Sequence, residues 1–488
     1  MLLEGKEGNK MKTVNANKEK LFIGGEWKEA NQYSDLKSPY QDRVIAQIPI
    51  AEKEDVEKAI DSAEQAKKKM KKLTALERSE ILERVVEIFK ERFEECALIL
   101  TKENAKPLKA ARAEVARTIE TYKFAAEEAK RIHGETIPID AAKNGAGKFA
   151  FTKREPLGVI AAITPFNFPF NLIAHKLGPA IATGNTVILK PASQTPLSAF
   201  MTAEIFEKAG LPKGALNVVT GQGSKIGDIL VTDSRIKMVT FTGSVDVGLG
   251  IRNKAGLKKV TLELGSNSAV IVDSVNNLDH VVGRCVEGSF AFAGQVCISI
   301  QRIYVQEELF DEFVQRFVEK TKQLIVGDPA EEDTDLSVLI HQREAERVEN
   351  WIEAARKSGS NVIYGGNREG AFLQPTVITN VDSNQEVSCQ EAFAPIVSIN
   401  PYKTFDEAVG LVNNSSYGLQ AGVFTTDVQK AFRSIDSLEV GGVIVNDIPS
   451  FRVDHMPYGG VKNSGTGREG IKYSMEEMTE LKLAVFNV

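Results

Sequence analysis

Apolar positions recur every three or four residues through the first third of the chain, a spacing that predicts helices. Before them, residues 21–30 predict a small hairpin with a Gly-Gly turn. Three helical segments are expected, and Thr74 and Glu77 begin the second with the spacing of a capping box. The apolar stripe behind them consists of Ile81, Val85, Phe89, Phe93, Cys96 and Leu100. Cys96 is therefore expected to be a buried core residue.

From residue 156 the pattern changes to short apolar runs, separated by segments that can each hold one helix. The first set of expected strands is 158–166, 186–192, 216–221, 238–244 and 259–264. The second set is 269–274, 302–306, 395–402, 421–426 and 441–446. Near-continuous apolar strands that alternate with helices predict two parallel sheets, each covered on both faces. Ligands of such sheets bind at the carboxyl ends of the strands.

Composition narrows the possible partners and compartment. The 488 residues are too many for one compact core, so two or more domains are expected. Lys and Arg number 60 against 66 Asp and Glu, and this formal charge of -6 argues against a nucleic-acid binder. The basic run at 67–72 fits the exposed face of a helix. Because no apolar run suits a membrane and the N-terminal residues lack a secretory core, a cytoplasmic protein is expected, starting at Met1 or Met11.

The cysteines and histidines predict no metal site. The four cysteines are scattered, which is typical of neither a disulfide framework nor a zinc ribbon, and the five histidines lack metal-ligand spacing. Cys297 lies near Gly294, Gln295 and Ser299, in a predicted loop, where catalytic residues are frequent. A lone cysteine is nevertheless most often an inert small hydrophobe. The neighbouring residues alone leave both interpretations of Cys297 open, and its spacing does not exclude a pairing with a histidine.

Two strand-to-helix turns are rich in glycine, GQGSKIG at 221–227 and FTGSVDVG at 241–248. Gly221 begins the first turn, whose third glycine is one position late for a dinucleotide fingerprint. Gly243 in the second turn permits a tight bend before a helix N-terminus, which offers N–H groups to a phosphate. Either turn alone is equally well a plain connection, whereas two in one sheet favour a nucleotide.

Two polar residues in apolar surroundings are candidates for catalysis. Asn167 follows a predicted strand, and its amide suits either an oxyanion site or a cap of the next helix. Glu263 ends an apolar strand, where desolvation would raise its pKa and suit it to act as a general base. An unidentified Lys or Arg partner is the equal alternative for Glu263.

Seven segments together resemble the aldehyde dehydrogenase superfamily, from about residue 20 to the C-terminus. They are TPFNFP, KPASQTP, FTGS, LELG, GQVC, EAFAP and PYGGVKNSGTGREG, in the family's order. The resemblance implies an α/β fold with a Rossmann-type dinucleotide-binding domain, an α/β catalytic domain and a small oligomerisation β-hairpin, in a homodimer or homotetramer. The expected bounds are 20–134 and 156–263 for the first domain, 264–455 for the second, and 135–155 with 475–488 for the oligomerisation segments. The alternating stretch 147–156 suits an exposed edge strand that seeks a partner.

The resemblance also assigns catalytic roles. Cys297 matches the family's nucleophile, which attacks the aldehyde to give a thiohemiacetal and, after hydride transfer, a thioester. A lowered pKa is expected for such a thiol. The Asn167 amide and the Cys297 backbone N–H match the oxyanion donors. Glu263 matches the general base that activates water, the second substrate, so a free carboxylic acid is the expected product because CoA-acylating members lack this glutamate.

A nicotinamide cofactor, NAD or NADP, is implied as well. The matched contact residues are Thr164, Pro165, Lys190, Ser193, Gly221, Gly243, Ser244, Glu391 and Phe393. Lys190 is expected at the adenosine ribose, Gly243 and Ser244 at the pyrophosphate, and Glu391 at the nicotinamide ribose. Many NAD-preferring members carry a glutamate where this chain has Ser193, and a glutamate there would repel a 2′-phosphate. We therefore expect NADP to be tolerated.

The substrate region is most similar to the lactaldehyde, sulfolactaldehyde and phosphonoacetaldehyde dehydrogenase group, and succinate semialdehyde dehydrogenases are also close. The stretches that carry this similarity are PFNFPFNLIAHK and SFRVDHMPYGGVK. Expected substrate-binding residues are Arg117, Asn171, His175, Ile298, Arg452 and His455. Arginines and histidines favour a small hydroxylated or anionic aldehyde. A non-catalytic oligomeric scaffold and a thiol acyltransferase are the alternatives from other classes.

Overall fold

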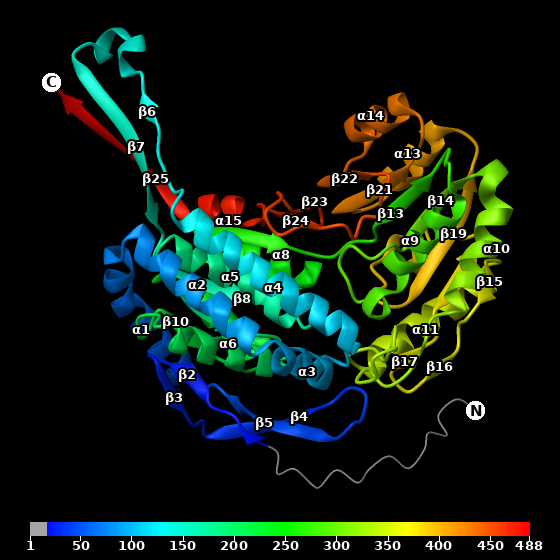
Figure 1. Ribbon diagram of the computed structural model, residues 1–488, viewed down its shortest axis with the longest axis horizontal. Coiled ribbons are helices and arrows are strands. Elements are labelled where there is room, and N and C mark those ends of the chain that lie inside the picture. The colour runs from blue at the N-terminus through cyan, green and yellow to red at the C-terminus, as the bar shows by residue number, and fades with distance from the viewer. Residues whose placement is uncertain (1–16) are drawn as a thin grey trace.

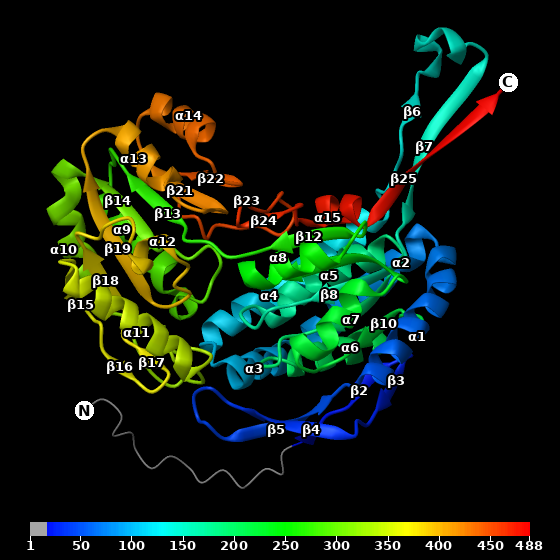
Figure 2. The same cartoon turned by 180° about the vertical axis from the view of Figure 1, so that it is seen from behind.

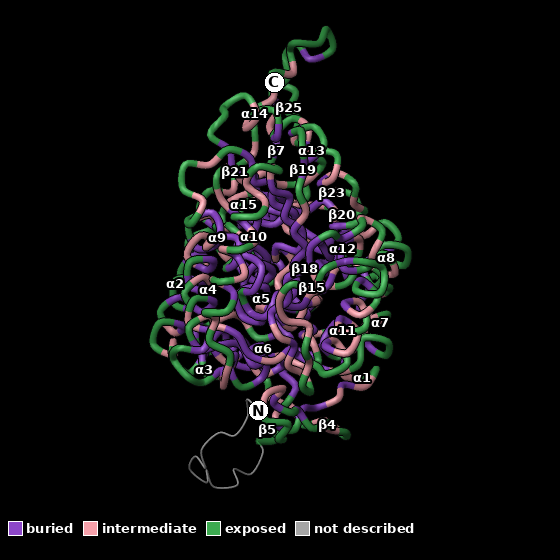
Figure 3. Tube along the Cα trace, turned by 90° about the vertical axis from the view of Figure 1, so that its right-hand side faces the viewer, coloured by how far each residue is buried: buried purple, intermediate pink, exposed green. Residues whose placement is uncertain are grey.

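The computed structural model describes residues 17–488, so the candidate start residues Met1 and Met11 lie outside the described part. Two α/β halves stand side by side, and a narrow three-stranded sheet projects from one of them (Figure 1). The view from behind shows the same division (Figure 2). Buried residues fill the body of the molecule, whereas the projecting sheet is largely exposed (Figure 3).

The N-terminal segment forms a hairpin and four helices, where three were expected. Strands β2 (Leu21–Ile23) and β3 (Glu26–Lys28) flank Gly24 and Gly25, whose φ angles are 71° and 77°. The helices are α1 (Lys53–Lys72), α2 (Ala75–Glu91), α3 (Phe93–Asn104) and α4 (Leu108–Ala129). The expected second helix is divided at Arg92, whose φ of -101° and ψ of 21° are not helical. Its apolar stripe therefore continues across two helices.

Local predictions for these helices are confirmed. Thr74 and Glu77 form a capping box, and Cys96 is fully buried. The run 67–72 directs its lysines outward around the buried Met70. A separate small sheet is formed by β1 (Asn17–Lys18), β4 (Gln32–Lys37) and β5 (Val44–Ile50).

The first predicted parallel sheet is present. Its predicted strands are β8 (Val159–Ile163), β9 (Thr186–Lys190), β10 (Leu216–Val218), β11 (Ile236–Thr242) and β12 (Lys259–Glu263). These five are parallel neighbours in the order β12-β11-β8-β9-β10, while β24 (Gly465–Thr466) and β2 join the two sides antiparallel. Ile160 and Ala161 of β8 enter different cores, so both faces of the sheet are covered.

Helices of the first half divide between those two cores. α5 (Pro169–Ala182) and α6 (Leu197–Lys208) pack with α2, α3 and α4 in one core. α1, α7 (Asp228–Thr232) and α8 (Val245–Lys254) pack in the other. The turns that lead into α5 and α8 therefore lie at the same edge of the sheet, the carboxyl ends of β8 and β11.

The second predicted sheet has the order β15-β18-β19-β14-β13-β21-β22. The predicted strands are β13 (Ala269–Val272), β14 (Arg302–Gln306), β19 (Ile396–Tyr402), β21 (Gln420–Phe424) and β22 (Gly442–Val445). β15 (Asn361–Tyr364) and β18 (Thr376–Thr379) extend the sheet and were not predicted. The longer helices are α9 (Leu278–Phe290), α10 (Phe310–Thr321), α11 (Gln342–Lys357), α13 (Phe405–Asn413) and α14 (Val428–Ser437). Short elements are β16 (Arg368–Glu369), β17 (Phe372–Leu373), β20 (Tyr417–Gly418), β23 (Val461–Lys462), α12 (Glu386–Cys389) and α15 (Ile471–Glu477).

The expectation that 147–156 is an edge strand is wrong. In the projecting sheet, β7 (Lys148–Pro156) is the central strand, between β6 (Thr136–Ile137) and β25 (Thr479–Asn487). The C-terminal strand of the same chain pairs with β7 over nine residue pairs and covers the backbone groups that were expected to face a partner. The edge strand is therefore β25, whose side chains Leu481, Leu483 and Phe486 are exposed. No helix among residues 17–488 is both long and apolar enough to span a membrane.

Candidate active site

One cavity of about 1090 Å³ lies at the carboxyl ends of the first sheet, and residues from both halves line it. It brings together twelve of the residues predicted from sequence: Arg117, Pro165, Asn167, Asn171, Gly243, Ser244, Glu263, Cys297, Ile298, Glu391, Phe393 and Arg452. Six other predicted residues do not line it: Thr164, His175, Lys190, Ser193, Gly221 and His455. Within residues 17–488, no three His, Cys, Asp or Glu side chains form a group that could hold a metal ion.

Cys297 lies in the loop between α9 and β14, as predicted. The loop is shaped by Phe292 and Ala293, whose φ angles are 47° and 54°, followed by Gly294 at 71°. A side chain at Gly294 would lie 2.2 Å from the carbonyl oxygen of Ala394, so only glycine fits this approach. This tight path ends the α9 segment abruptly and directs the thiol into the cavity.

Burial raises the pKa of the Cys297 thiol to about 11, although the nearby Tyr458 hydroxyl and Arg452 lower it. Without a bound cofactor, desolvation of a thiolate outweighs one hydrogen bond and one cation. The lowered pKa expected of a nucleophile stays a prediction for the enzyme with cofactor bound. The hydroxyl oxygen of Tyr458 lies 3.0 Å from the sulfur atom, within hydrogen-bond distance.

Asn167 does not cap the helix that follows it. Its Nδ2 donates to the carbonyl oxygen of Gln295, two residues before Cys297, at 3.0 Å. The backbone N–H groups of Phe170 and Asn171 at the start of α5 donate to Glu114 instead, at 3.0 and 3.3 Å. The capping alternative is therefore wrong, and the amide lies beside the nucleophile loop.

A buried lysine fixes the position of Asn167. Lys106 Nζ donates to the backbone oxygen of Asn167 at 2.6 Å and pairs with Glu114. The same ammonium lies over the rings of Phe168 and Phe292, 3.9 and 4.5 Å from their centres. The Lys106 ammonium therefore contacts both the Asn167 loop and the Cys297 loop and holds them near each other.

Glu263 is the last residue of β12, and it has no ionic partner. Both of its carboxylate oxygens are buried without a hydrogen-bond partner among the described residues. Burial raises its pKa well above the ordinary value, and the nearby Glu469 adds to the effect. The alternative of a paired structural glutamate is therefore wrong, and the group has the properties of a desolvated base.

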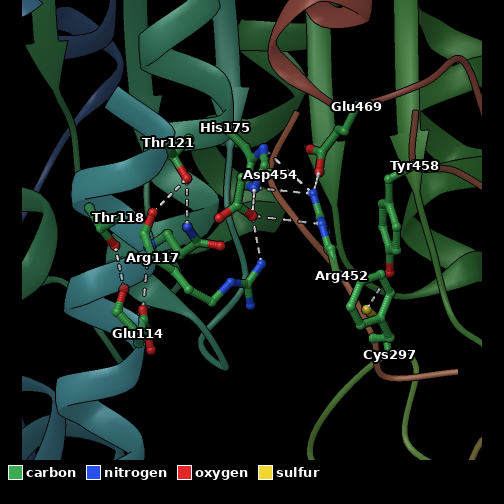
Figure 4. Close-up of polar contacts among 12 residues, drawn as sticks. Glu114, Arg117, Thr118, Thr121, His175, Cys297, Arg452, Asp454, Tyr458 and Glu469 are labelled. Carbon is green, nitrogen blue, oxygen red and sulfur yellow. Dashed lines mark hydrogen bonds and ion pairs between the residues drawn. The ribbon is translucent and has the colours of Figure 1, made fainter. Parts of the chain in front are cut away.

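Basic and acidic side chains form a buried cluster beside the thiol (Figure 4). Arg117 of α4 pairs with Asp454 at 2.6 Å, and Arg452 pairs with Glu469 at 3.1 Å. Lys176 of α5 also pairs with Glu469, at 3.1 Å. Three basic groups therefore face two carboxylates. The Nε–H groups of Arg117 and Arg452 are buried and have no hydrogen-bond partner among residues 17–488, although Arg452 Nε lies 4.0 Å from Asp454 Oδ1.

Neither predicted histidine supplies a cation to the cavity. His175 is fully buried, with its Nε2 2.9 Å from Asp454 Oδ1, and burial together with Arg452 lowers its pKa. His455 is exposed and lies against the ring of Phe124, 4.7 Å between centres. Asn171, which does line the cavity, donates from its amide to the hydroxyl of Thr121 at 3.0 Å.

The other end of the cavity suits a nucleotide. Ser244 is the N-cap of the ten-residue helix α8 but makes no side-chain cap, so the first N–H groups of α8 are available to an anion. Gly243 N donates to the carbonyl oxygen of Glu263 at 3.0 Å, which ties this turn to the candidate base. Glu391 accepts from Ser266 N at 2.9 Å, and burial raises its pKa to about 7.

Four predicted cofactor residues lie outside the cavity lining, and Thr164 at the end of β8 is one of them. Lys190, at the carboxyl end of β9, is buried, and its Nζ donates to the carbonyl oxygen of Pro191 at 3.2 Å. Ser193 is exposed, in the same loop. Gly221 follows β10 with a φ of 154°, a conformation that L side chains rarely adopt.

Sequence reasoning missed Tyr458, Asp454, Glu469, Lys176 and Lys106. Each of these residues is polar and buried. A polar residue near apolar residues in the sequence, the pattern that identified Asn167 and Glu263, was the signal that could have found them. Asp454 and Tyr458 lie in the stretch SFRVDHMPYGGVK, which carried the similarity to the lactaldehyde dehydrogenase group. These side chains form ion pairs and hydrogen bonds with residues from other segments of the chain. No single segment of the sequence could therefore predict which residues contact each other.

Comparisons with known proteins match this chain to the family model described as aldehyde dehydrogenase family, over residues 27–484. The chain is 48% identical over 468 residues to the 3-sulfolactaldehyde dehydrogenase of Priestia aryabhattai, covering 96% of this chain and 98% of that protein. It is similar to the crystal structure of aldehyde dehydrogenase 21 from Physcomitrella patens in complex with the reaction product succinate, with TM-score 0.96, 44% identity, and 97% and 99% coverage. A glyceraldehyde-3-phosphate dehydrogenase from Methanocaldococcus jannaschii complexed with NADP matches with TM-score 0.90, 42% identity, and 94% and 100% coverage.

Proposed function

The chain belongs to the aldehyde dehydrogenase family and has its α/β fold, and we propose that it oxidises a small polar or anionic aldehyde to the carboxylic acid through a thioester on Cys297. It is an NAD(P)-dependent enzyme of that family. Family membership therefore excludes the two alternative functions, a non-catalytic scaffold and a thiol acyltransferase. The observation that supports the substrate class is that two arginines, Arg117 and Arg452, line the same cavity as Cys297.

Charge supports an anionic substrate. The cluster around Asp454 and Glu469 contains one more basic side chain than it has carboxylates. Arginine N–H groups match carboxylate, sulfonate and phosphonate oxygens. Both arginines line the cavity, and 34% of the Arg117 side chain is exposed. An anionic group of the substrate would meet their guanidinium groups there.

The relatives point to the same chemistry. One relative is named for a sulfonated aldehyde, one was solved with the dicarboxylate product succinate, and one is named for a phosphorylated aldehyde. We favour a lactaldehyde-like or sulfolactaldehyde-like substrate, which combines a short chain with polar groups. Succinate semialdehyde is the second candidate, because its far carboxylate would meet the same arginines.

Catalysis is proposed to begin at the sulfur of Cys297. The sulfur attacks the aldehyde carbon, and the carbon–oxygen double bond opens toward the Asn167 amide and the Cys297 backbone N–H. Asn167 Nδ2 has to exchange its bond to Gln295 for the substrate oxygen. A bound nicotinamide supplies the hydride acceptor, and loss of hydride and a proton leaves the acyl group on sulfur.

Hydrolysis of the thioester is proposed to depend on Glu263. Its unpartnered carboxylate takes a proton from water, which attacks the acyl carbon and releases the acid and the thiol. A raised pKa strengthens the base but keeps a larger share of it protonated at neutral pH.

We propose that the cofactor binds with its pyrophosphate at Gly243 and Ser244 and its nicotinamide ribose at Glu391. The uncapped start of α8 and the buried carboxyl of Glu391 fit these groups. Thr164, Pro165, Gly221 and Phe393 are proposed to enclose the bound molecule. Lys190 and Ser193 are proposed to lie at the adenosine ribose, where no acidic side chain opposes a 2′-phosphate.

A Ser193→Glu substitution tests the cofactor assignment. We expect the KM for NADP to rise about tenfold or more while the KM for NAD changes little, because the new carboxylate repels only the 2′-phosphate. Initial rates with each cofactor at saturating aldehyde measure this. An unchanged ratio of the two KM values would show that Ser193 does not lie near the ribose.

An Arg452→Gln substitution tests the substrate class. We expect kcat/KM for 3-sulfolactaldehyde to fall about 10- to 100-fold, since a charge-assisted hydrogen bond is lost. Propanal should change by less than about threefold, because it has no anionic group. Arg316→Gln, on the exposed surface of α10, is the matched control. An equal fall in kcat/KM for both aldehydes would contradict the proposed contact between Arg452 and the anionic group.

We also propose a cytoplasmic homodimer or homotetramer, assembled through the projecting sheet. The cysteines of the described chain are all unpaired thiols, as a reducing compartment favours. The edge strand β25 exposes Leu481, Leu483 and Phe486, and apolar side chains along an unpaired edge favour association with a second copy. Sedimentation of the full chain measures the oligomeric state.

A further inference from the structure

The hydroxyl of Tyr458 is the polar group placed beside the reactive sulfur. Its oxygen lies 3.0 Å from Cys297 Sγ, which is its one hydrogen-bond partner among residues 17–488, and the side chain is 2% exposed. The Tyr458 N–H donates to the Glu469 carbonyl oxygen at 3.0 Å, and the Glu469 N–H donates back at 2.6 Å. The Arg452 guanidinium lies over the Tyr458 ring, 3.7 Å from its centre. The hydroxyl is therefore held firmly at this place.

The proposed reaction leaves the Tyr458 hydroxyl with only a weak acceptor at the sulfur. When the sulfur of Cys297 bonds to the aldehyde carbon, the thiol hydrogen is lost and the sulfur becomes a thioether, which is a weak acceptor. A buried hydroxyl left without a partner is unfavourable. A substrate oxygen within one or two bonds of the reacting carbon is the replacement that the geometry allows.

Two substrate atoms are that close to the sulfur. The aldehyde oxygen is directed to Asn167 and the Cys297 backbone N–H in the proposed mechanism. The other is a substituent on the neighbouring carbon, C2. A hydroxyl there both donates and accepts, as the tyrosine hydroxyl does, so the two form a good pair. The next carbon of a short chain would then carry its anionic group toward Arg452, which stacks on the same tyrosine ring.

We propose that Tyr458 selects aldehydes with a hydroxyl group on C2, by binding that hydroxyl as the carbon–sulfur bond forms. This inference rests on the proposed function and narrows it to α-hydroxyaldehydes. It separates lactaldehyde-like and sulfolactaldehyde-like substrates from succinate semialdehyde, which has no oxygen at C2. Tyr458 acts here as a specificity-determining residue that touches the substrate.

The test compares 2-hydroxy-3-sulfopropanal with 3-sulfopropanal, which differ only in the C2 hydroxyl. We expect the wild-type enzyme to favour the hydroxylated aldehyde about tenfold or more in kcat/KM. In Tyr458→Phe that preference should fall to about one, because the hydroxylated aldehyde loses its contact with the tyrosine hydroxyl, whereas 3-sulfopropanal has no such contact to lose. Lactaldehyde and propanal form a second pair, without the anionic group.

Two results would overturn the inference. Equal loss for both aldehydes in Tyr458→Phe would mean that the hydroxyl only positions the thiol, and a retained preference would place recognition of the C2 hydroxyl elsewhere. Failure of the proposed function looks different, because the wild-type enzyme would then prefer propanal to all polar aldehydes.

A binding experiment covers the case in which Tyr458→Phe does not fold. Calorimetry on Cys297→Ala should give 2-hydroxy-3-sulfopropanoate a Kd about threefold or more below that of 3-sulfopropanoate, because the tyrosine hydroxyl there has no thiol partner. Equal Kd values would overturn the inference.

Discussion

Cys297→Ser should lower NAD(P)H formation by about 10⁴-fold or more with every aldehyde, since loss of a nucleophile removes the covalent route. The serine oxygen is smaller and, as an alcohol, much less readily ionised than the thiol. The backbone N–H at this position remains, so cofactor and aldehyde should still bind. Stopped-flow absorbance of the reduced nicotinamide measures the rate, and calorimetry measures cofactor binding.

The matched control for this substitution is Cys389→Ser. Cys389 is half-buried at the end of α12, its thiol donates to the Asn384 carbonyl oxygen at 3.4 Å, and it does not line the cavity. Its variant should keep wild-type activity. Activity in Cys297→Ser close to that of Cys389→Ser would contradict the assignment of the nucleophile.

Glu263→Gln should separate the two halves of the reaction. The amide has the same shape as the carboxylate but cannot take a proton from water, so steady-state turnover should fall about 10²- to 10⁴-fold. Formation of the thioester does not require activated water. The variant should therefore release a rapid burst of reduced nicotinamide, about one per active site, before the slow phase.

The pH dependence of the slow phase provides the control. Burial raises the pKa of Glu263, and only the deprotonated form accepts a proton. In the wild-type enzyme, hydrolysis should therefore increase as the pH rises through that pKa and be lost below it. Glu263→Gln should show no such increase. A variant with neither a burst nor an altered pH profile would place the base on another residue.

Much of the fold was predictable because its strands are buried on both faces. β8 to β12 and β13, β14, β19, β21 and β22 appear as near-continuous apolar runs, and each was predicted within a few residues. β15 was missed because its alternate residues are exposed, which weakens the apolar signal. The order of the strands and the central position of β7 depend on pairings with distant segments, such as β25, that no local pattern contains.

The candidate site was predictable where one segment carries both the residue and its context. Cys297 in its loop and Glu263 at its strand end are examples, and the ordered motifs added Asn167. The electrostatics were not predictable. The raised pKa of Cys297 and the lowered pKa of His175 follow from burial and from contacts with Tyr458, Arg452 and Asp454, which come from other segments.

In the proposed mechanism the acyl group of the substrate is carried by Cys297, and mass spectrometry of the trapped enzyme can detect it there. Glu263→Gln is mixed with 3-sulfolactaldehyde and NADP, quenched in acid after the burst, and digested for mass spectrometry. The peptide containing Cys297 should gain the mass of the acyl group, and no other cysteine peptide should. Reduced nicotinamide formed at one per site, with Cys297 unmodified at the earliest quench times, would contradict this mechanism.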